Sequence, residues 1–254
     1  MKKIQIDKLH LDKKEHFYTG ESCEIYRDFT NIYKVFDDSN HEFTKDKLKR
    51  QLALQKYKSI LDGHIILPHT FILDKNDSIT GYIEKNLIRT TSLYDYKINT
   101  QKDVDKLYYI LGQINYLLRE LHNLNIYLGD FHFDNILINK RNKVFLVDFD
   151  NIKIDDLESF TISRLLSIFL AYYNISYDSI KIGKDSDNLS LLLSIMFLFL
   201  GDNYLDLENE KNNYFLFRIP LLYEIVEILK YVVKYKEICS IPYCDEICTK
   251  IKRP

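Results

Sequence analysis

The spacing of hydrophobic and polar positions changes along the chain, and the change predicts two regions. Residues 15–36 contain short alternating segments typical of strands, with the turn-forming segment "RDFTN" between two of them. The segments "HIILPHTFIL" and "ITGYIEKNL" predict two further strands. Residues 44–61 place Leu48 and Leu52 on one face of a helix, so one helix is expected among these strands.

The pattern becomes helical from about residue 90. The segment 103–125 carries apolar residues at a spacing of three to four over its whole length, and further helices are predicted at 159–173, 187–200 and about 219–235. Between them, "KVFLVDF" predicts a strand. The sequence therefore predicts an α+β protein with two lobes, a β-rich N-lobe at residues 1–86 and a mostly helical C-lobe at residues 87–254.

Composition narrows the class of protein. The formal net charge of −2 gives no general affinity for nucleic acids or anionic membranes. The longest apolar run, Leu189–Gly201, is shorter than the roughly 20 residues that span a bilayer, and the basic N-terminus leads into no apolar segment of the kind found in signal peptides. Cys239, Cys244 and Cys248 lack the spacing of a zinc site. We expect a cytoplasmic protein whose partners include neither nucleic acid nor membrane.

The segment from Ile126 to Asn151 places acidic residues among residues that favour burial. An unpaired buried carboxylate costs several kcal/mol, so these acids need partners or a function. Asn135 follows Asp130 by five positions, and Asp148 follows Asn135 by thirteen. A short hairpin around "NKRNK" would bring Asn135 and Asp148 together at its open end. Their oxygens are the ligands that Mg²⁺ shares with phosphates, and Asp130 would face the same space.

The segment "LRELHNLNIYLGDFHFDNILI", followed by "VFLVDFD", resembles the catalytic core of the protein-kinase-like superfamily. It is similar in particular to atypical bacterial or phage Ser/Thr kinases and to aminoglycoside phosphotransferases. The resemblance implies that Asp130 is the catalytic residue that orients the acceptor hydroxyl, and that His132 either contacts phosphate or orients Asp130. It implies Asn135 and Asp148 as the Mg²⁺ ligands.

The resemblance covers roughly residues 15–200 and implies an ATP site in the N-lobe. Lys34 in "IYKVF" matches the lysine that pairs with phosphates, and Gly20 lies in the loop that covers them. Glu84 and Lys85 match the connector between the lobes. An apolar slot for adenine is expected from four further residues: Ile25, Ile32, Leu137 and Val147.

The nucleotide-binding part departs from the family pattern at two places. Gly20 is the only one of the three expected loop glycines, which restricts the backbone near the phosphates. The helix lacks the glutamate that should pair with Lys34, and Gln51 and Gln55 lie on the corresponding face. A neutral partner would position Lys34 by a hydrogen bond instead of an ion pair.

The segments around Asp130 and Asp148 also differ from the family pattern. Gly129 replaces an arginine that, in regulated kinases, receives a phosphorylated loop. The D-F-G triplet reads D-F-D, so Asp150 is expected either to stiffen the loop or to join the metal site. Asp187 matches the aspartate that holds the backbone of the catalytic loop.

These observations favour an ATP- and Mg²⁺-dependent phosphotransferase whose phosphate acceptor is unknown, with protein Ser/Thr favoured over a small molecule. The combination of Asp130, Asn135 and Asp148 supports an enzyme. The altered glycine loop and the missing glutamate support an alternative, a pseudokinase acting as a nucleotide-binding regulatory or scaffold module. A kinase of small-molecule hydroxyl groups is the third possibility.

Overall fold

The structure is a computed structural model that describes residues 2–19, 23–37, 41–61, 63–159, 161–208 and 219–251. Its contacts divide the chain into two compact units, which are described separately. The N-terminal unit comprises Met1–Thr90 and Phe145–Asp150, and the helical unit comprises Thr91–Val144 and Asn151–Pro254. A short segment from the middle of the sequence is therefore part of the N-terminal unit.

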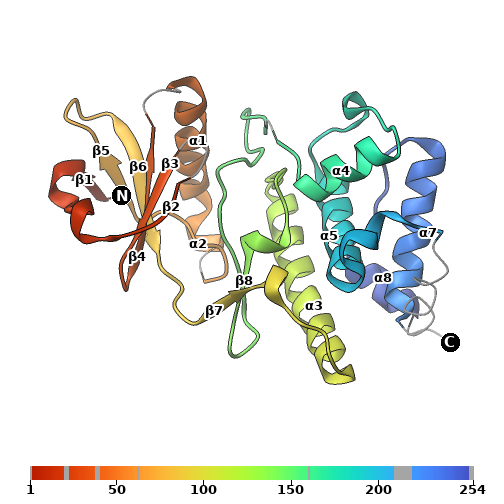
Figure 1. Ribbon diagram of the computed structural model, residues 1–254. Coiled ribbons are helices and arrows are strands. Elements are labelled where there is room, and N and C mark those ends of the chain that lie inside the picture. Colours follow the sequence, from red (N-terminus) through yellow and green to blue (C-terminus); the bar gives the residue numbers. More distant parts are fainter. Residues whose placement is uncertain are drawn as a thin grey trace. The chain divides into compact units, whose positions relative to one another are not determined.

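A six-stranded sheet in the order β1-β5-β6-β4-β3-β2 forms the centre of the N-terminal unit (Figure 1). In the turn between β3 and β4, the Asp28 carboxylate accepts hydrogen bonds from the amides of Thr30 and Asn31, which confirms the predicted hairpin. Strand β1 was not predicted, and it pairs in parallel with the distant strand β5. The strands are β1 (Lys2–Gln5), β2 (Glu15–Thr19), β3 (Cys23–Arg27), β4 (Asn31–Phe36), β5 (Thr70–Leu73) and β6 (Ile79–Lys85).

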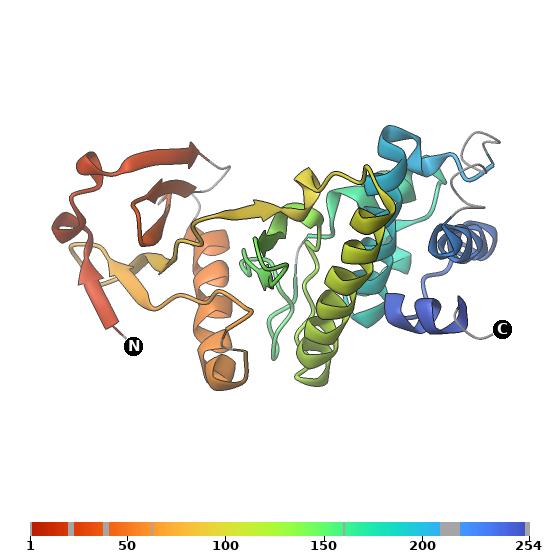
Figure 2. The same cartoon turned by 90° about the horizontal axis from the view of Figure 1, so that it is seen from below.

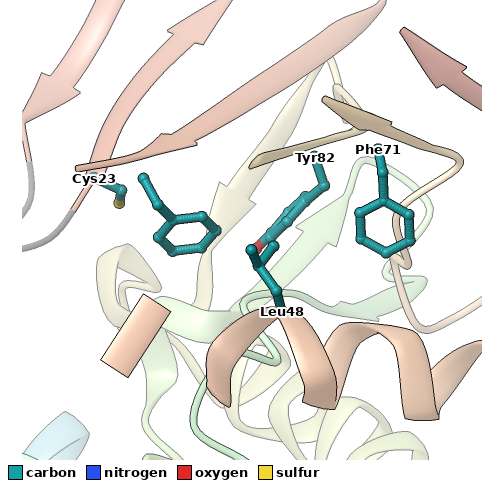
Figure 3. Close-up of a cluster of buried hydrophobic side chains, with 5 residues drawn as sticks. Cys23, Leu48, Phe71 and Tyr82 are labelled. Atoms are coloured by element: carbon teal, nitrogen blue, oxygen red, sulfur yellow. The ribbon is translucent and has the colours of Figure 1, made fainter. Parts of the chain in front are cut away.

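Helix α1 (His41–Leu54) lies along one face of this sheet (Figures 1 and 2). The predicted helix at 44–61 is interrupted after Leu54 by a 3-10 turn, η4 (Gln55–Tyr57), and resumes as α2 (Lys58–Leu61). Figure 3 shows the buried hydrophobic cluster that Leu48 of α1 forms with four side chains of the sheet. These are Cys23, Phe36, Phe71 and Tyr82.

The opposite face of the sheet is covered by the chain that follows β1. This chain forms two short 3-10 helices, η1 (Ile6–Leu9) and η2 (Leu11–Lys13). Leu9 packs against Tyr33, Ile72 and Ile83 there. Because both faces are covered, charged side chains within the sheet need partners in the protein.

The segment Phe145–Asp150 is tied to the N-terminal unit by backbone hydrogen bonds. The amide of Leu146 donates to the carbonyl of His64 at 2.8 Å, and the amide of Ile66 donates to the carbonyl of Leu146 at 3.0 Å. These bonds fix the chain just before Asp148 and Asp150.

The helical unit begins with η5 (Leu93–Asp95) and the long helix α3 (Gln101–Asn123). Thr100 and Asp103 cap α3 reciprocally, each side chain accepting from the backbone amide of the other. The predicted helices are confirmed as α3, α4 (Arg164–Tyr172), α5 (Lys184–Leu200) and α7 (Pro220–Tyr235). The 3-10 turn η7 (Tyr177–Ser179) lies between α4 and α5, η8 (Gly201–Leu205) follows α5, and α8 (Cys244–Ile251) follows α7. Helix α5 packs against α4, α7 and α8, and therefore forms the core of this unit.

Lys184–Leu205, which contains α5, passes a length and composition test for a membrane span within the described part of the chain. The apolar run Leu189–Gly201, which by itself is too short to span a membrane, is only part of this longer helical segment. However, 56% of its most apolar window is buried inside the protein, as expected for the core helix of a folded domain.

The predicted hairpin around "NKRNK" forms between two short strands. Strand β8 (Ile136–Asn139) lies beside β7 (Thr90–Ser92) and follows the 3-10 turn η6 (Phe133–Asn135). The chain then turns at residues 139–143, where the amide of Asn139 donates to the carbonyl of Lys143 at 3.1 Å. It continues as β9 (Val144–Leu146), where it enters the N-terminal unit. The architecture is α+β, as the sequence predicted.

Candidate active site

Lys34 lies in the middle of the N-terminal sheet, where β4 pairs it with Ile25 of β3 and Tyr82 of β6. Its side-chain ammonium is 2.8 Å from Oδ1 of Asp148 and forms a second ion pair with Asp150. Burial alone would lower the pKa of Lys34, but the two carboxylates raise it well above the ordinary value. Lys34 is therefore a charged lysine although only 8% of the residue is exposed.

Asp150 is the more buried of the two carboxylates that contact Lys34, with 2% of its side chain exposed. Its Oδ1 accepts hydrogen bonds from the Tyr82 hydroxyl at 2.7 Å and from Nε2 of Gln51 at 2.9 Å, while Oδ2 meets Lys34. The expected hydrogen bond from a neutral helix residue to Lys34 is replaced by these contacts, because Gln51 donates to Asp150. We call Lys34, Gln51, Tyr82, Asp148 and Asp150 the lysine cluster.

The sheet register shows which predicted ATP-binding residues share a face with Lys34. Antiparallel partners point to the same side, and Ile25 pairs with Lys34 while Ile32 pairs with Glu84. Ile25, Ile32 and Glu84 therefore lie on the face of Lys34, whereas the side chain of Lys85 belongs to the opposite face.

The remaining residues predicted to bind ATP lie elsewhere in the chain. Val147 is half-buried in the N-terminal unit, and Leu137 is half-buried on β8 of the helical unit. Gly20 lies outside the described residues.

Glu84 carries an unusual protonation state for a glutamate. Burial, the largest cause, raises its pKa to about 8, with Lys34 opposing the shift and Asp148 and Asp150 adding to it. The carboxyl group of Glu84 is therefore protonated at neutral pH. A neutral carboxyl can donate a hydrogen bond where an ionised one cannot.

Asp130, His132 and Asn135 lie together in the helical unit, in and just before η6. Nε2 of His132 is 3.9 Å from Oδ1 of Asp130, and its Nδ1 is 3.4 Å from Oδ2 of Asp134. Nδ2 of Asn135 donates to the backbone carbonyl of Asp130 at 3.2 Å. About a third of the Asp130 side chain is exposed, 35%, which leaves its carboxylate reachable by a substrate.

Asp187 holds the backbone in front of Asp130, as the sequence predicted. Its carboxylate is completely buried and accepts hydrogen bonds from the amides of Leu128 at 2.8 Å and Gly129 at 3.1 Å. Nε2 of His122 is 3.1 Å from the same carboxylate, and Nδ1 of His122 is 2.8 Å from the Tyr243 hydroxyl. The stretch 128–135, called the Asp130 loop below, thus rests on a buried polar network.

The backbone conformation and the close neighbours of Gly129 explain why this position has no side chain. Its φ is +62°, and a Cβ at this position would lie 2.4 Å from Oγ of Ser159 and 2.8 Å from the carbonyl oxygen of Thr161. Because L-residues rarely adopt this conformation, an arginine here would be strained as well as obstructed. The loss of that arginine is therefore part of how the Asp130 loop packs.

The two predicted metal ligands belong to different units, Asn135 to the helical unit and Asp148 to the N-terminal unit. About half of the Asp148 side chain is exposed, and the amide nitrogen of Asn135 is engaged, which leaves its oxygen for another partner. The described residues contain no group of three His, Cys, Asp or Glu that could hold a metal alone. Each of these two oxygens, taken by itself, is of the kind that binds Mg²⁺, which is commonly held by one or two protein oxygens together with phosphates and water.

Sequence reasoning did not single out Tyr82 and His122, which hold Asp150 and Asp187 respectively. For Tyr82 there was a signal, since it precedes Glu84 by two positions and so lies on the same face of its strand. For His122 the signal was its place at the end of α3, just before the Asp130 loop.

Comparisons with known proteins give a match in structure. No protein-family model matches the sequence, and no curated protein sequence matches it either. Among solved structures, the kinase domain of a Toxoplasma gondii specific rhoptry antigen matches with a TM-score of 0.60 and 13% identity, over 93% of this chain and 81% of that one. The match gives no support to a bacterial or phage origin. The chain has the protein-kinase-like fold.

Proposed function

We propose that the protein is an ATP- and Mg²⁺-dependent phosphotransferase. The observation that carries this proposal is the ion pair between the buried Lys34 and the half-exposed Asp148. A buried lysine beside an exposed aspartate offers a cation for the phosphates and a carboxylate for their metal ion. The preserved spacing of Asp130, Asn135 and Asp148 supports the same conclusion.

Each residue would have a defined task. Lys34 would bind the α- and β-phosphates, and Asn135 and Asp148 would hold Mg²⁺, which when bound neutralises charge on the phosphates. Asp130 would orient the acceptor hydroxyl and accept its proton. His132, 3.9 Å from Asp130, would keep that carboxylate in place or contact phosphate. Catalysis would thus depend on positioning and on neutralisation of charge.

The phosphate acceptor follows less directly from the residues. The helix end "LHNLNIY" before the Asp130 loop resembles that of Ser/Thr kinases, so a protein Ser or Thr is favoured over a small-molecule hydroxyl. A phosphoproteomic comparison of cells with the wild type and with Asp130→Asn would identify the acceptor.

A pseudokinase is the second candidate, and one observation favours it. Lys34 is already paired with two carboxylates, so a nucleotide has to compete with Asp148 for the ammonium. A protein that only binds nucleotide, or that uses this cluster to stabilise its fold, would have the same pairs.

The test uses Asp148→Ala. Thermal-shift titrations with ATP, with and without Mg²⁺, should show a Mg²⁺-dependent stabilisation in the wild type that is lost in the variant. Asp95→Ala is a matched control, because Asp95 is an exposed aspartate of η5 in the helical unit. An unchanged Mg²⁺-dependent shift in Asp148→Ala would remove this residue from the site. Absence of turnover by the wild type, across acceptor proteins and small molecules with ATP and GTP, would favour the pseudokinase.

A further inference from the structure

We infer that Asp150 is the positioning residue that supplies the anionic partner of Lys34, in place of the glutamate missing from α1, and that Gln51 and Tyr82 hold it there. This inference rests on the proposed function and adds a residue to it. The D-F-D triplet and the glutamine in the helix, two departures that look independent in the sequence, become a single change in which the negative charge has moved from the helix to the loop.

Burial and hydrogen bonding favour this role for Asp150 over metal binding. Only 2% of its side chain is exposed, and both of its oxygens are engaged, Oδ1 by Tyr82 and Gln51 and Oδ2 by Lys34. By contrast, 49% of the Asp148 side chain is exposed. Of the two carboxylates that meet Lys34, Asp148 is thus the one accessible to a metal ion and Asp150 is the one fixed inside the protein.

The polar contacts of Gln51 explain why this helix position is neutral. Gln51 is 2% exposed and its Nε2 lies 2.9 Å from Oδ1 of Asp150. A glutamate there would place a second carboxyl group against Asp150, and one of the two would have to take up a proton or remain as an uncompensated buried charge. Glutamine supplies the donor that Asp150 requires, so the two residues depend on each other.

Moving the negative charge from the helix to the loop also changes which elements of the fold hold the ion pair of Lys34. In protein kinases, a lysine–glutamate pair depends on the position of the helix that carries the glutamate. Here the carboxylate lies four positions after the end of β9 and also accepts a hydrogen bond from Tyr82 of the sheet, so the pair with Lys34 is made by the sheet and the loop. Helix α1 contributes a neutral hydrogen bond from Gln51 to Asp150, and the Arg50 guanidinium of the same helix also interacts electrostatically with this carboxylate.

The decisive experiment moves the negative charge from position 150 of the loop to position 51 of helix α1. Asp150→Asn should lower phosphate transfer by about 10-fold to 100-fold and raise the KM for ATP, because Lys34 loses the anion that orients it. Gln51→Glu alone should lower the melting temperature, since it sets two buried carboxylates together. The double variant Gln51→Glu with Asp150→Asn should recover at least about tenfold of the turnover lost in Asp150→Asn, with a KM closer to that of the wild type.

A matched control uses Gln55, one turn further along, whose Nε2 donates to the carbonyl of Pro68. Gln55→Glu should not rescue Asp150→Asn. Wild-type turnover and KM in Asp150→Asn, or a double variant no better than Asp150→Asn alone, would overturn the assignment.

A second measurement separates this inference from the proposed function. Lys34→Met leaves Asp148 and Asp150 without their shared cation, so it should lower the melting temperature, and adding Asp150→Asn should raise it again because one of the uncompensated charges is gone. Losses that simply add would overturn the pairing of Lys34 with Asp150. If the wild type neither binds ATP nor transfers phosphate, the proposed function fails, and this melting cycle alone decides the inference.

Discussion

The lysine cluster of the N-terminal unit and the Asp130 loop of the helical unit hold charge in opposite surroundings. In the lysine cluster the charged groups Lys34 and Asp150 are themselves buried and satisfy each other. In the Asp130 loop the candidate catalytic side chains of Asp130 and His132 are partly exposed, and the buried carboxylate is that of Asp187, which holds the backbone of the loop.

The difference shows two ways of placing a charge where chemistry needs it. A buried ion pair is rigid, but loss of one partner leaves an uncompensated charge that costs several kcal/mol. An exposed carboxylate on an anchored loop is solvated by water, so it can be replaced without loss of the fold. We therefore expect substitutions that remove buried charge to affect stability and substitutions in the exposed part of the Asp130 loop to affect turnover.

The largest effect is expected for Asp187→Ala, beneath the Asp130 loop. The amides of Leu128 and Gly129 would lose their buried acceptor, and each unsatisfied amide costs about 1–3 kcal/mol. We expect a loss of about 3–5 kcal/mol in the free energy of unfolding, measured by urea denaturation. Asp185→Ala, two positions earlier in α5 at a less buried aspartate, is the control and should lose less. A loss below about 1 kcal/mol would show that the network does not hold the loop.

Asp130→Asn should separate turnover from stability. Its carboxylate is partly exposed, so its replacement should leave the melting temperature and the affinity for ATP nearly unchanged. Turnover should fall by about 100-fold or more, the scale for loss of a positioned acid–base group. Asp134→Asn, an exposed neighbour in the same loop, is the matched control and should keep most of its activity. Wild-type turnover in Asp130→Asn would exclude it from the mechanism; a large loss of stability would instead assign it a structural role.

The smallest effect concerns Glu84, on the same face of the sheet as Lys34. Its pKa is raised from 4.5 to about 8 in the folded protein, so the folded state holds this proton more tightly than the unfolded chain. The stability that it contributes is complete below pH 4.5 and is lost as pH rises towards 8. Glu84→Gln cannot ionise and should remove this loss. Relative to the wild type, it should gain about 2–3 kcal/mol of stability between pH 5 and pH 7.

Melting curves at pH 5, 6, 7 and 8 for both proteins measure this difference. Glu24→Gln serves as the control, because Glu24 is an exposed glutamate on strand β3 of the same sheet. Parallel pH profiles for Glu84→Gln and the wild type would mean that Glu84 is ionised in the folded protein, and the contrast between buried and exposed charge would then not extend to this residue.

Local patterns in the sequence determined the elements and the order of the candidate site residues. The 3.6-residue period predicted α3, α4, α5 and α7 because each helix buries one face or all of its surface, and the alternating segments predicted the strands around Lys34. The contact of Asp187 with the Asp130 loop also followed from the sequence, since the segment that contains Asp187 resembles the central buried helix of the family.

Only the tertiary structure decided which charges meet. Gln51 and Asp150 are 99 positions apart, and Lys34 and Asp148 are 114 positions apart, so no periodicity reports their contact. The parallel pairing of β1 with β5 could not be predicted for the same reason. Nor could the contact between Gly129 and Ser159, whose Oγ leaves no room for a Cβ at position 129. The sequence determined where a carboxylate, an amide or a lysine stands along the chain. The folded structure determined which of them share a buried volume, because desolvation makes a partner necessary there and the packing of distant segments supplies it.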